Sequence, residues 1–304
     1  MRVQQNHGDV MNNQCYIYGG LLADCYYEVS CWPQRSQDGL ILGEKVMAGG
    51  CAVNMAATIK NLGGEPLVIS AMGDDAQAKD LFNYMEEKGF RTEFLWPAGG
   101  ASGKCMVFLE PDGERTFLTG KGAETVYPQE LDQRIRREAP AAVGITGYYL
   151  LNSGASAVLD TVEYFASCGS KVLFDPSPLV SSIEDGILRR VLAVSHIMTP
   201  NTTELSHIER FVSVEQYVAG GRTAVVKSGS SGGTVYTPSE TFDYSAAPVC
   251  EVKDTTGAGD SFAGALLYSM VQGLPVREAV ELAAVCAAKT VEIQGPHGFW
   301  SLSD

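Results

Sequence analysis

The stretch DTTGAGDSFAG, residues 254–264, places a glycine-rich turn and two carboxylates at the start of an apolar helix. Backbone N–H groups at such a helix start form an anion site, which the helix dipole strengthens. In an anion site Asp260 would repel a phosphate, unless its carboxylate accepts the proton of a hydroxyl that attacks a phosphoryl group. A structural alternative makes Asp254 an N-cap and Asp260 a first-turn acid. The length of the run favours the chemical interpretation.

A second glycine-rich stretch, AGGCAVNMA at residues 48–56, has the residue types that bind a polyhydroxylated ligand. Gly49 and Gly50 let the backbone approach such a ligand closely. The Asn54 amide offers both a hydrogen-bond donor and an acceptor to the hydroxyls of such a ligand. A glycine turn that precedes a helix over residues 53–62 explains the same pattern without a ligand.

The run from Asp254 to Phe262 resembles the C-terminal signature of the PfkB, or ribokinase-like, carbohydrate kinases, and the stretch around Asn54 resembles the N-terminal one. This resemblance spans about residues 14–295. It implies phosphoryl transfer from ATP to a hydroxyl of a small sugar or sugar-like substrate. In the family, the second aspartate of the signature is the catalytic base and the Gly-Ala-Gly backbone forms the anion hole. The resemblance therefore implies these roles for Asp260 and for Gly257, Ala258 and Gly259.

The same resemblance suggests residues for the substrate and for magnesium. Asp24 matches the aspartate that accepts a sugar hydroxyl, although a solvated loop acid is the simpler interpretation. Asn201 and Glu204 match an NxxE motif that is associated with Mg²⁺ and phosphate. An amide and a carboxylate on one helical turn can hold Mg²⁺ through its waters. A capping box explains the same spacing, and the two interpretations are compatible.

Residues 225–233, VVKSGSSGG, have the pattern of a strand end that leads into a glycine-rich turn. In relatives the corresponding loop contacts the nucleotide, so the candidates here are Lys227, Ser228, Gly229 and Gly232. A plain hairpin explains the glycines equally well. By resemblance, residues 287–289 and 293–295 would form the other wall of the adenine site. Some relatives also bind a monovalent cation, possible here as K⁺, which would implicate Asp254 and Thr256.

The elements that position these residues alternate between short β-favouring runs and amphipathic helical stretches. Strands are expected at Cys15–Gly19, Leu67–Met72, Cys105–Leu109, Val143–Gly147, Val172–Asp175, His196–Thr199, Ala224–Ser228 and Thr234–Tyr236, with a β-like segment at Pro248–Lys253. Helices are expected at Val53–Leu62, Ala76–Lys88, Gln129–Glu138, Ser156–Ala166, Ile183–Ala193, Thr202–Ile208, Gly259–Val271 and Val276–Glu292. This order predicts an α/β fold, a ribokinase-like, doubly wound and mostly parallel sheet flanked by helices.

Two segments interrupt the alternation, residues 25–50 and 92–120, which contain short β-like pieces and turns. We expect a small β lid there that excludes water from phosphoryl transfer, with ordinary surface hairpins as the alternative. Exposed lid edges would also allow a homodimer. No linker or repeat divides the chain, so a single kinase domain is expected over residues 11–304, after a disordered leader at 1–10.

Composition excludes several classes of protein. A formal net charge of −14 without a basic stripe argues against a nucleic-acid partner. The sequence has no run of eighteen apolar residues and its first ten residues lack the apolar core of a signal peptide, so we expect no membrane partner and a cytoplasmic location. The eight cysteines are scattered without a CxxC pair, which favours free thiols over a zinc site or disulfides.

Other functions are less consistent with the sequence. A Rossmann-type oxidoreductase needs GxGxxG after the first strand, and residues 19–23 do not provide it. Gly103-Lys104-Cys105 is similar to part of a P-loop but lacks its other residues, so Lys104 is expected to open a lid strand. A nucleoside kinase of the same fold and a catalytically silent sugar-binding or regulatory protein stay open. A nucleoside would need a shelf for its base, for which the candidates are Tyr26, Trp32, Phe108 and Phe117.

Overall fold

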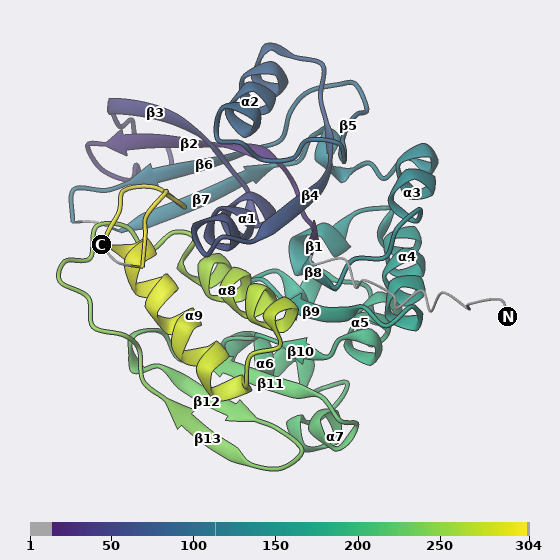
Figure 1. Ribbon diagram of the computed structural model, residues 1–304. Coiled ribbons are helices and arrows are strands. Elements are labelled where there is room, and N and C mark those ends of the chain that lie inside the picture. The colour runs from purple at the N-terminus through teal and green to yellow at the C-terminus, as the bar shows by residue number, and fades with distance from the viewer. Residues whose placement is uncertain (1–13, 113, 303–304) are drawn as a thin grey trace, which may run out of the picture.

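The computed structural model describes residues 14–112 and 114–302, which form a large sheet between two layers of helices and a smaller sheet above one edge (Figure 1). The leader expected at residues 1–10 lies outside the described residues. The large sheet has the strand order β13-β12-β11-β10-β9-β8-β1-β4-β5. Pairing is parallel from β5 to β11 and antiparallel for β12 and β13. The predicted doubly wound, mostly parallel α/β fold is confirmed.

The central strands of the large sheet are buried, whereas β5, β12 and β13 at its edges are partly exposed. Their bounds are β1 (Gln14–Tyr18), β4 (Glu65–Met72), β5 (Leu95–Pro97), β8 (Ala142–Thr146), β9 (Lys171–Asp175), β10 (Ile197–Met198), β11 (Thr223–Lys227), β12 (Gly233–Tyr236) and β13 (Thr241–Tyr244). Since the central strands are parallel, their carboxyl ends meet at one edge of the sheet, where ligands bind in folds of this type.

Helices cover both faces of this sheet. One layer contains α1 (Cys51–Asn61), α2 (Ala76–Glu87), α8 (Ala258–Gln272) and α9 (Val276–Val291). The other contains α3 (Gln129–Ile135), α4 (Ala155–Ser167), α5 (Asp185–Val194), α6 (Thr202–Ile208) and α7 (Val214–Ala219). Consecutive strand residues supply the two cores in turn, because side chains alternate across a strand. Ile17 of β1 packs in the first core and Tyr18 in the second.

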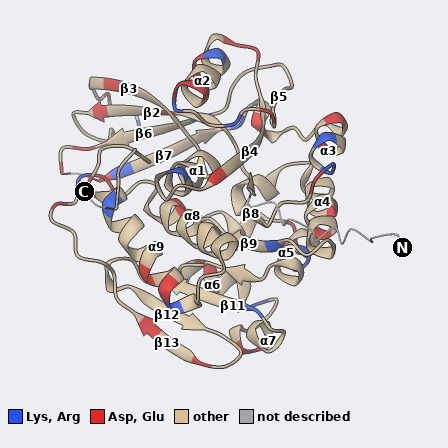
Figure 2. Cartoon of the chain, in the orientation of Figure 1, with Lys and Arg blue, Asp and Glu red and all other residues tan. Residues whose placement is uncertain are grey.

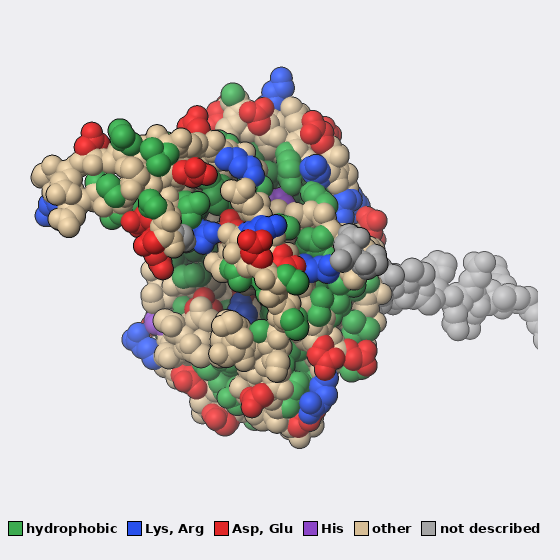
Figure 3. Space-filling model, turned by 90° about the vertical axis from the view of Figure 1, so that its left-hand side faces the viewer, with side chains coloured by type: hydrophobic (Ala, Val, Ile, Leu, Met, Phe, Trp, Pro, Cys, Tyr) green, Lys and Arg blue, Asp and Glu red, His purple; other side chains and the backbone are tan. Residues whose placement is uncertain are grey.

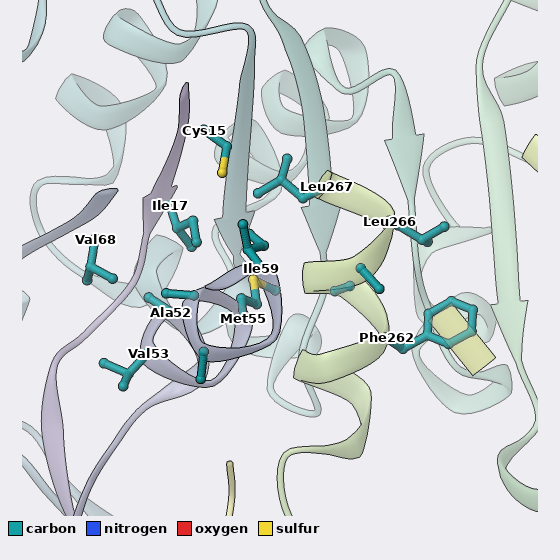
Figure 4. Close-up of a cluster of buried hydrophobic side chains, with 14 of the residues drawn as sticks. Cys15, Ile17, Ala52, Val53, Met55, Ile59, Val68, Phe262, Leu266 and Leu267 are labelled. Atoms are coloured by element: carbon teal, nitrogen blue, oxygen red, sulfur yellow. The ribbon is translucent and has the colours of Figure 1, made fainter. Parts of the chain in front are cut away.

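Close packing of α1 against α8 holds together the two helices that carry the glycine-rich signatures (Figure 4). Met55 and Ile59 of α1 lie in one apolar cluster with Phe262, Leu266 and Leu267 of α8. A methyl group on Gly264 would lie 2.6 Å from the Met55 carbonyl oxygen, so only glycine permits this approach. The relative position of α1 and α8 is therefore fixed by backbone contact.

The smaller sheet, called the lid below, has the order β3-β2-β6-β7. Its strands are β2 (Leu22–Val29), β3 (Ile41–Gly49), β6 (Lys104–Leu109) and β7 (Arg115–Gly120). The pairing register places Asp24, Tyr26 and Arg115 on one face of this sheet. Tyr27 and Phe108 share the opposite face, where their rings stack 5.5 Å apart between centroids.

Differences from the predicted elements are concentrated in short or irregular segments. Residues 95–97 pair with β4, so this part of the segment 92–120 lies in the large sheet and outside the lid. Residues 248–253 were expected to be β-like but form no strand, and α7 and β13 were not predicted. Lys104 opens the lid strand β6, as expected.

The surface is consistent with the overall charge. Acidic and basic residues are interspersed along the elements, without a continuous basic stripe on the described residues in this view (Figure 2). Among the described helices, none combines the length and apolar content that a membrane-spanning helix requires.

Candidate active site

The N-terminus of α8 is shaped by Gly257, which precedes the helix with a φ of 76°. A side chain on Gly257 would be strained in this left-handed conformation, and its Cβ would lie 1.8 Å from the Pro296 carbonyl oxygen. Ala258 and Gly259 follow as the first helical residues. Small residues at the start of a fifteen-residue helix leave the first backbone N–H groups open to an anion.

Asp260 lies in the first turn of α8 and contacts α1. Its Oδ2 atom accepts a hydrogen bond of 2.8 Å from Asn54 Nδ2. Burial raises the pKa of Asp260 to about 6 and the negative charge of Asp175 adds to this, while hydrogen bonds from Asn54 and Cys51 and the charge of Lys227 oppose it. The carboxylate is thus ionised near neutral pH and is a stronger base than a solvated aspartate.

Asp24 extends from the lid towards the same place. Burial raises its pKa to about 7, and the charges of Asp260 and Asp254 contribute. A methyl group on Gly49 would lie 2.1 Å from Asp24 Oδ2, and one on Gly50 would lie 2.1 Å from a backbone carbonyl oxygen. Both glycines are therefore required by close approach, and the structure brings Gly49, Gly50 and Asp24 together beside Asn54 and Asp260.

A second group of polar side chains lies at the carboxyl ends of β9, β10 and β11. Asn201 caps α6, and its Oδ1 atom accepts a 2.9 Å hydrogen bond from the Glu204 backbone N–H. The Glu204 carboxylate accepts hydrogen bonds from the Asn201 backbone N–H and from Asn201 Nδ2, at 2.8 and 2.9 Å. The capping box expected as an alternative is present, and burial raises the pKa of Glu204.

Lys227 ends β11 next to Asn201, and its Nζ atom contacts Asp175 Oδ1 at 2.8 Å. Burial alone would lower the pKa of Lys227, but the charge and hydrogen bond of Asp175 raise it, so the lysine stays protonated. Thr199 donates a further hydrogen bond of 2.6 Å to the same carboxylate oxygen. This places a positive charge within the polar group at the sheet edge.

The glycine-rich turn after Lys227 is a hairpin between β11 and β12, which pair antiparallel. The Ser228 backbone N–H donates a 2.7 Å hydrogen bond to the Gly232 carbonyl oxygen across this turn. Gly232 has a φ of 85°, and a methyl group there would lie 2.0 Å from the Tyr244 carbonyl oxygen. Gly229 has open space where its side chain would be. Gly229 also has a positive φ, of 59°. The hairpin therefore explains both glycines, and the open space at Gly229 leaves room for a ligand.

Asp254 is buried beneath the lid. Its oxygens accept hydrogen bonds of 2.9 Å from the Thr256 backbone N–H and 3.1 Å from the Gly295 backbone N–H. Arg115 Nε of the lid lies 3.4 Å from Asp254 Oδ1. The buried hydroxyls of Thr256 and Tyr26 lie close together, and neither has a partner of ordinary hydrogen-bond geometry among the described residues.

Sequence reasoning missed several residues in this region. Asp175 had a usable signal, because it ends a predicted strand at the edge where ligands bind. The other missed residues reach the site through contacts between distant segments. Cys51 lies beside Asp260, Arg115 contacts Asp254, and His297 contacts Asn54. The pKa of Tyr148 is raised by burial and by nearby acidic groups that include Asp260 and Glu204.

Solved structures of kinases share this fold. The chain superposes on a Burkholderia thailandensis nucleoside kinase in complex with inosine with a TM-score of 0.82 and 20% identity, covering 94% of this chain and 93% of that one. It superposes on Arabidopsis thaliana ribokinase complexed with ribose and ATP with a TM-score of 0.76 and 23% identity, covering 94% of each chain. The fold is that of the ribokinase-like kinases.

Residues 21–300 match the profile described as pfkB family carbohydrate kinase, and the chain belongs to this family. A curated relative, the uncharacterized sugar kinase YegV of Escherichia coli (strain K12), is 27% identical over 92% of this chain and 88% of its own. The protein is thus a carbohydrate kinase, as the sequence predicted.

A raised carboxylate pKa predicts how activity depends on pH. If Asp260 accepts the proton of the substrate it must be deprotonated, so kcat/KM should then rise with pH through about pH 6 and level off above it. Steady-state rates between pH 5 and 8 measure this. Asp175→Asn removes a neighbouring negative charge that raises this pKa, and should move the midpoint to lower pH. A profile that stays flat down to pH 5 would contradict the assignment.

Proposed function

We propose that the protein transfers the γ-phosphoryl group of ATP to a hydroxyl of a small sugar or sugar-like substrate, with Asp260 as the general base. The observation that carries this proposal is the position of Asp260 in the first turn of α8, held by Asn54 at 2.8 Å and preceded by the open turn at Gly257. A base and an anion site thereby lie side by side.

In this mechanism Asp260 accepts the proton of the substrate hydroxyl as its oxygen attacks the γ-phosphorus. Backbone N–H groups of Gly257, Ala258 and Gly259 stabilise the charge that develops on the transferred group. Lys227 adds a positive charge near Gly259, whose Cβ position lies 3.7 Å from Nζ. Phosphoryl transfer depends mainly on such positioning and electrostatic stabilisation.

Asp24, Asn54, Gly49 and Gly50 would bind the other hydroxyls of the substrate under the lid. Their donors and acceptors suit a pentose, hexose or sugar acid. A nucleoside is the second candidate, because Tyr26 lies on the same lid face as Asp24 and would offer a shelf for a base. Phe108 is less suitable, since it stacks on Tyr27 and contacts Trp32 on the opposite face.

For the nucleotide, we propose contacts with Lys227, Ser228, Gly229 and Gly232 on one side and with residues 287–289 and 293–295 on the other. Mg²⁺, when bound with ATP, would neutralise charge on the phosphates. Within the described part of the chain, no three His, Cys, Asp or Glu side chains gather as a direct metal site. Both oxygens of Glu204 are already bonded to Asn201, so these residues fit Mg²⁺ through its waters.

We place this activity in the cytoplasm within a single kinase domain over residues 11–304, with small molecules rather than nucleic acid or membrane as partners. The net charge of −14 supports this, because it disfavours a nucleic-acid backbone. Cell fractionation that recovers the protein with membranes would contradict it.

Replacing the base tests the mechanism directly. Asp260→Asn keeps the size of the side chain but cannot accept the proton, so phosphoryl transfer should fall about 10²- to 10⁴-fold while ATP binding survives. Release of ADP measures transfer, first for a panel of sugars, sugar acids and nucleosides with the unmodified protein. Asp160→Asn, in an exposed ion pair on α4, is the matched control. Retained turnover in Asp260→Asn rules out this base, and ATP binding without turnover of any panel member favours a silent binder.

The lid also suggests an oligomer. We propose a homodimer through lid edges, because β3 and β7 are edge strands and the lid exposes large apolar side chains such as Leu42 and Val46. Figure 3 shows hydrophobic side chains among polar ones on the face of the molecule that it displays. Sedimentation should find a dimer for the unmodified protein and a monomer for Leu42→Glu/Val46→Glu. Leu274→Glu, in an exposed loop between α8 and α9, should stay dimeric. A monomeric unmodified protein at micromolar concentration would refute the proposal.

A monovalent cation beside Asp254 stays a prediction. The unpartnered Thr256 hydroxyl fits such an ion, but Arg115 already brings a positive charge to Asp254. We therefore expect replacement of sodium by potassium to raise activity weakly, and more strongly in Arg115→Gln, which removes that charge. Rates at constant ionic strength measure this. Equal responses of the two proteins would show that Arg115 and the ion do not act at one place.

A further inference from the structure

A row of hydrogen bonds runs from the surface helix α2 to the carboxylate of Asp260. The Tyr84 hydroxyl lies 2.6 Å from His297 Nε2, and His297 Nδ1 lies 2.9 Å from Asn54 Oδ1. Asn54 Nδ2 lies 2.8 Å from Asp260 Oδ2. Four residues from three helices and the C-terminal segment are thus connected through side chains.

The chemistry of the groups sets the direction of every hydrogen bond. An ionised Asp260 only accepts, so the Asn54 amide must turn its nitrogen towards it and its oxygen towards His297. That oxygen also only accepts, so the proton of the neutral imidazole is on Nδ1. Nε2 is then left with its lone pair, which accepts the hydrogen of Tyr84. All donors point towards the carboxylate, an arrangement in which each bond strengthens the next.

Burial keeps this arrangement in one protonation state. His297 is 6% exposed and Asn54 is 5% exposed. Burial lowers the pKa of His297 to about 4, so the ring is neutral wherever the enzyme works. Among the residues that the structure describes, only Tyr84 and Asn54 hydrogen-bond to the ring. The titratable and charged groups that act on Asp260 are Cys51 from α1, Asp175 from β9, Lys227 from β11 and Asp24 from the lid.

The segment that carries His297 is held independently of the ring. Asn61 Nδ2 donates a 2.9 Å hydrogen bond to the Gly298 carbonyl oxygen. Phe299 lies 6.1 Å from Phe90 between ring centroids. These contacts offer a way to loosen the segment without removing the hydrogen bond to Asn54.

We propose that His297 is a positioning residue: its Nδ1–H group fixes the Asn54 amide so that the amide nitrogen faces Asp260 and the base is held for the substrate hydroxyl. The consequence for catalysis rests on the proposed role of Asp260, whereas the positioning itself does not. Without the imidazole, the amide can rotate, and its oxygen would then face the carboxylate unfavourably.

The test compares two substitutions at one position. His297→Leu removes both nitrogens. His297→Asn keeps a donor, because the Asn Nδ2 atom takes the place of Nδ1 on the same branch of the side chain. Carboxyl-¹³C NMR of ligand-free, Asp-labelled protein gives the titration midpoint of Asp260, whose signal is identified by its loss in Asp260→Asn.

We expect the Asp260 midpoint to rise by about half a pH unit in His297→Leu, because the N–H that stabilises the ionised form is no longer held. It should return towards the original value in His297→Asn. Imidazole ¹⁵N shifts of the unmodified protein should show the Nδ1–H tautomer. For the most active acceptor of the ADP-release panel, kcat should fall about tenfold in His297→Leu, with an unchanged KM for ATP.

Asn61→Ala is the control for a merely structural role, since it removes an anchor of the same segment but leaves His297 and Asn54 intact. If Asn61→Ala moves the Asp260 midpoint as much as His297→Leu, or if neither His297 variant moves it, the inference is overturned. If His297→Leu does not fold, an unrescued midpoint in His297→Asn or an Nε2–H tautomer overturns it instead. Turnover in Asp260→Asn would refute the base and leave the NMR result standing.

Discussion

The site depends on holding several carboxylates close together in a place poor in water. Asp24, Asp175, Asp254 and Glu204 are buried, and Asp260 lies among them. Such groups repel one another and lose hydration, so each is stable only with donors or positive charges nearby. Lys227 forms an ion pair with Asp175. Arg115 and backbone N–H groups stabilise the Asp254 carboxylate, and Asn54 donates a hydrogen bond to Asp260. Compensation is incomplete at Asp24 and Asp260, and the remaining repulsion and burial keep their pKa values above those of free carboxylates. The raised pKa values of Asp24 and Asp260 are thus a product of the fold.

Much of this fold could be predicted from the sequence, because its helices and central strands have strong local patterns. Helix α6 occupies the expected residues 202–208, and the other predicted helices differ only at their ends. The errors have a common cause. Helix α7 and strand β13 are too short for a clear periodicity, and residues 248–253 have β-forming side chains without a neighbouring strand to pair with. The lid was located only as two segments, since the pairing of β2 with β6 joins strands far apart in the sequence, and local patterns carry no information on such partners.

The residues of the candidate site also fall into those that lie in local sequence motifs and those that only long-range contacts bring together. Asp260, Asn54 and Glu204 lie within motifs whose spacing is local, so their positions could be predicted, and the structure brings Asp260 and Asn54 into contact. Arg115 and His297 lie in no such motif. His297 contacts a residue 243 positions earlier in the chain, and Arg115 reaches Asp254 only because the lid folds over the sheet edge. Contacts of this kind depend on the complete tertiary structure. The preference between a sugar and a nucleoside depends on the same lid, which is why the motifs identify a kinase but leave its acceptor open.

The segment from Gly295 to Gly298 determines when, during synthesis, the contacts around Asn54 and Gly257 can form. Its backbone contacts Asp254 and closes on Gly257, and its imidazole holds Asn54. Since synthesis proceeds from the N-terminus, α1 is complete long before this segment exists, and α8 also precedes it in the chain. The nascent chain therefore carries Asn54 well before the imidazole that it contacts exists. The contacts that hold the Asn54 amide and close on Gly257 can therefore form only after the segment that follows α9 has been made and has docked.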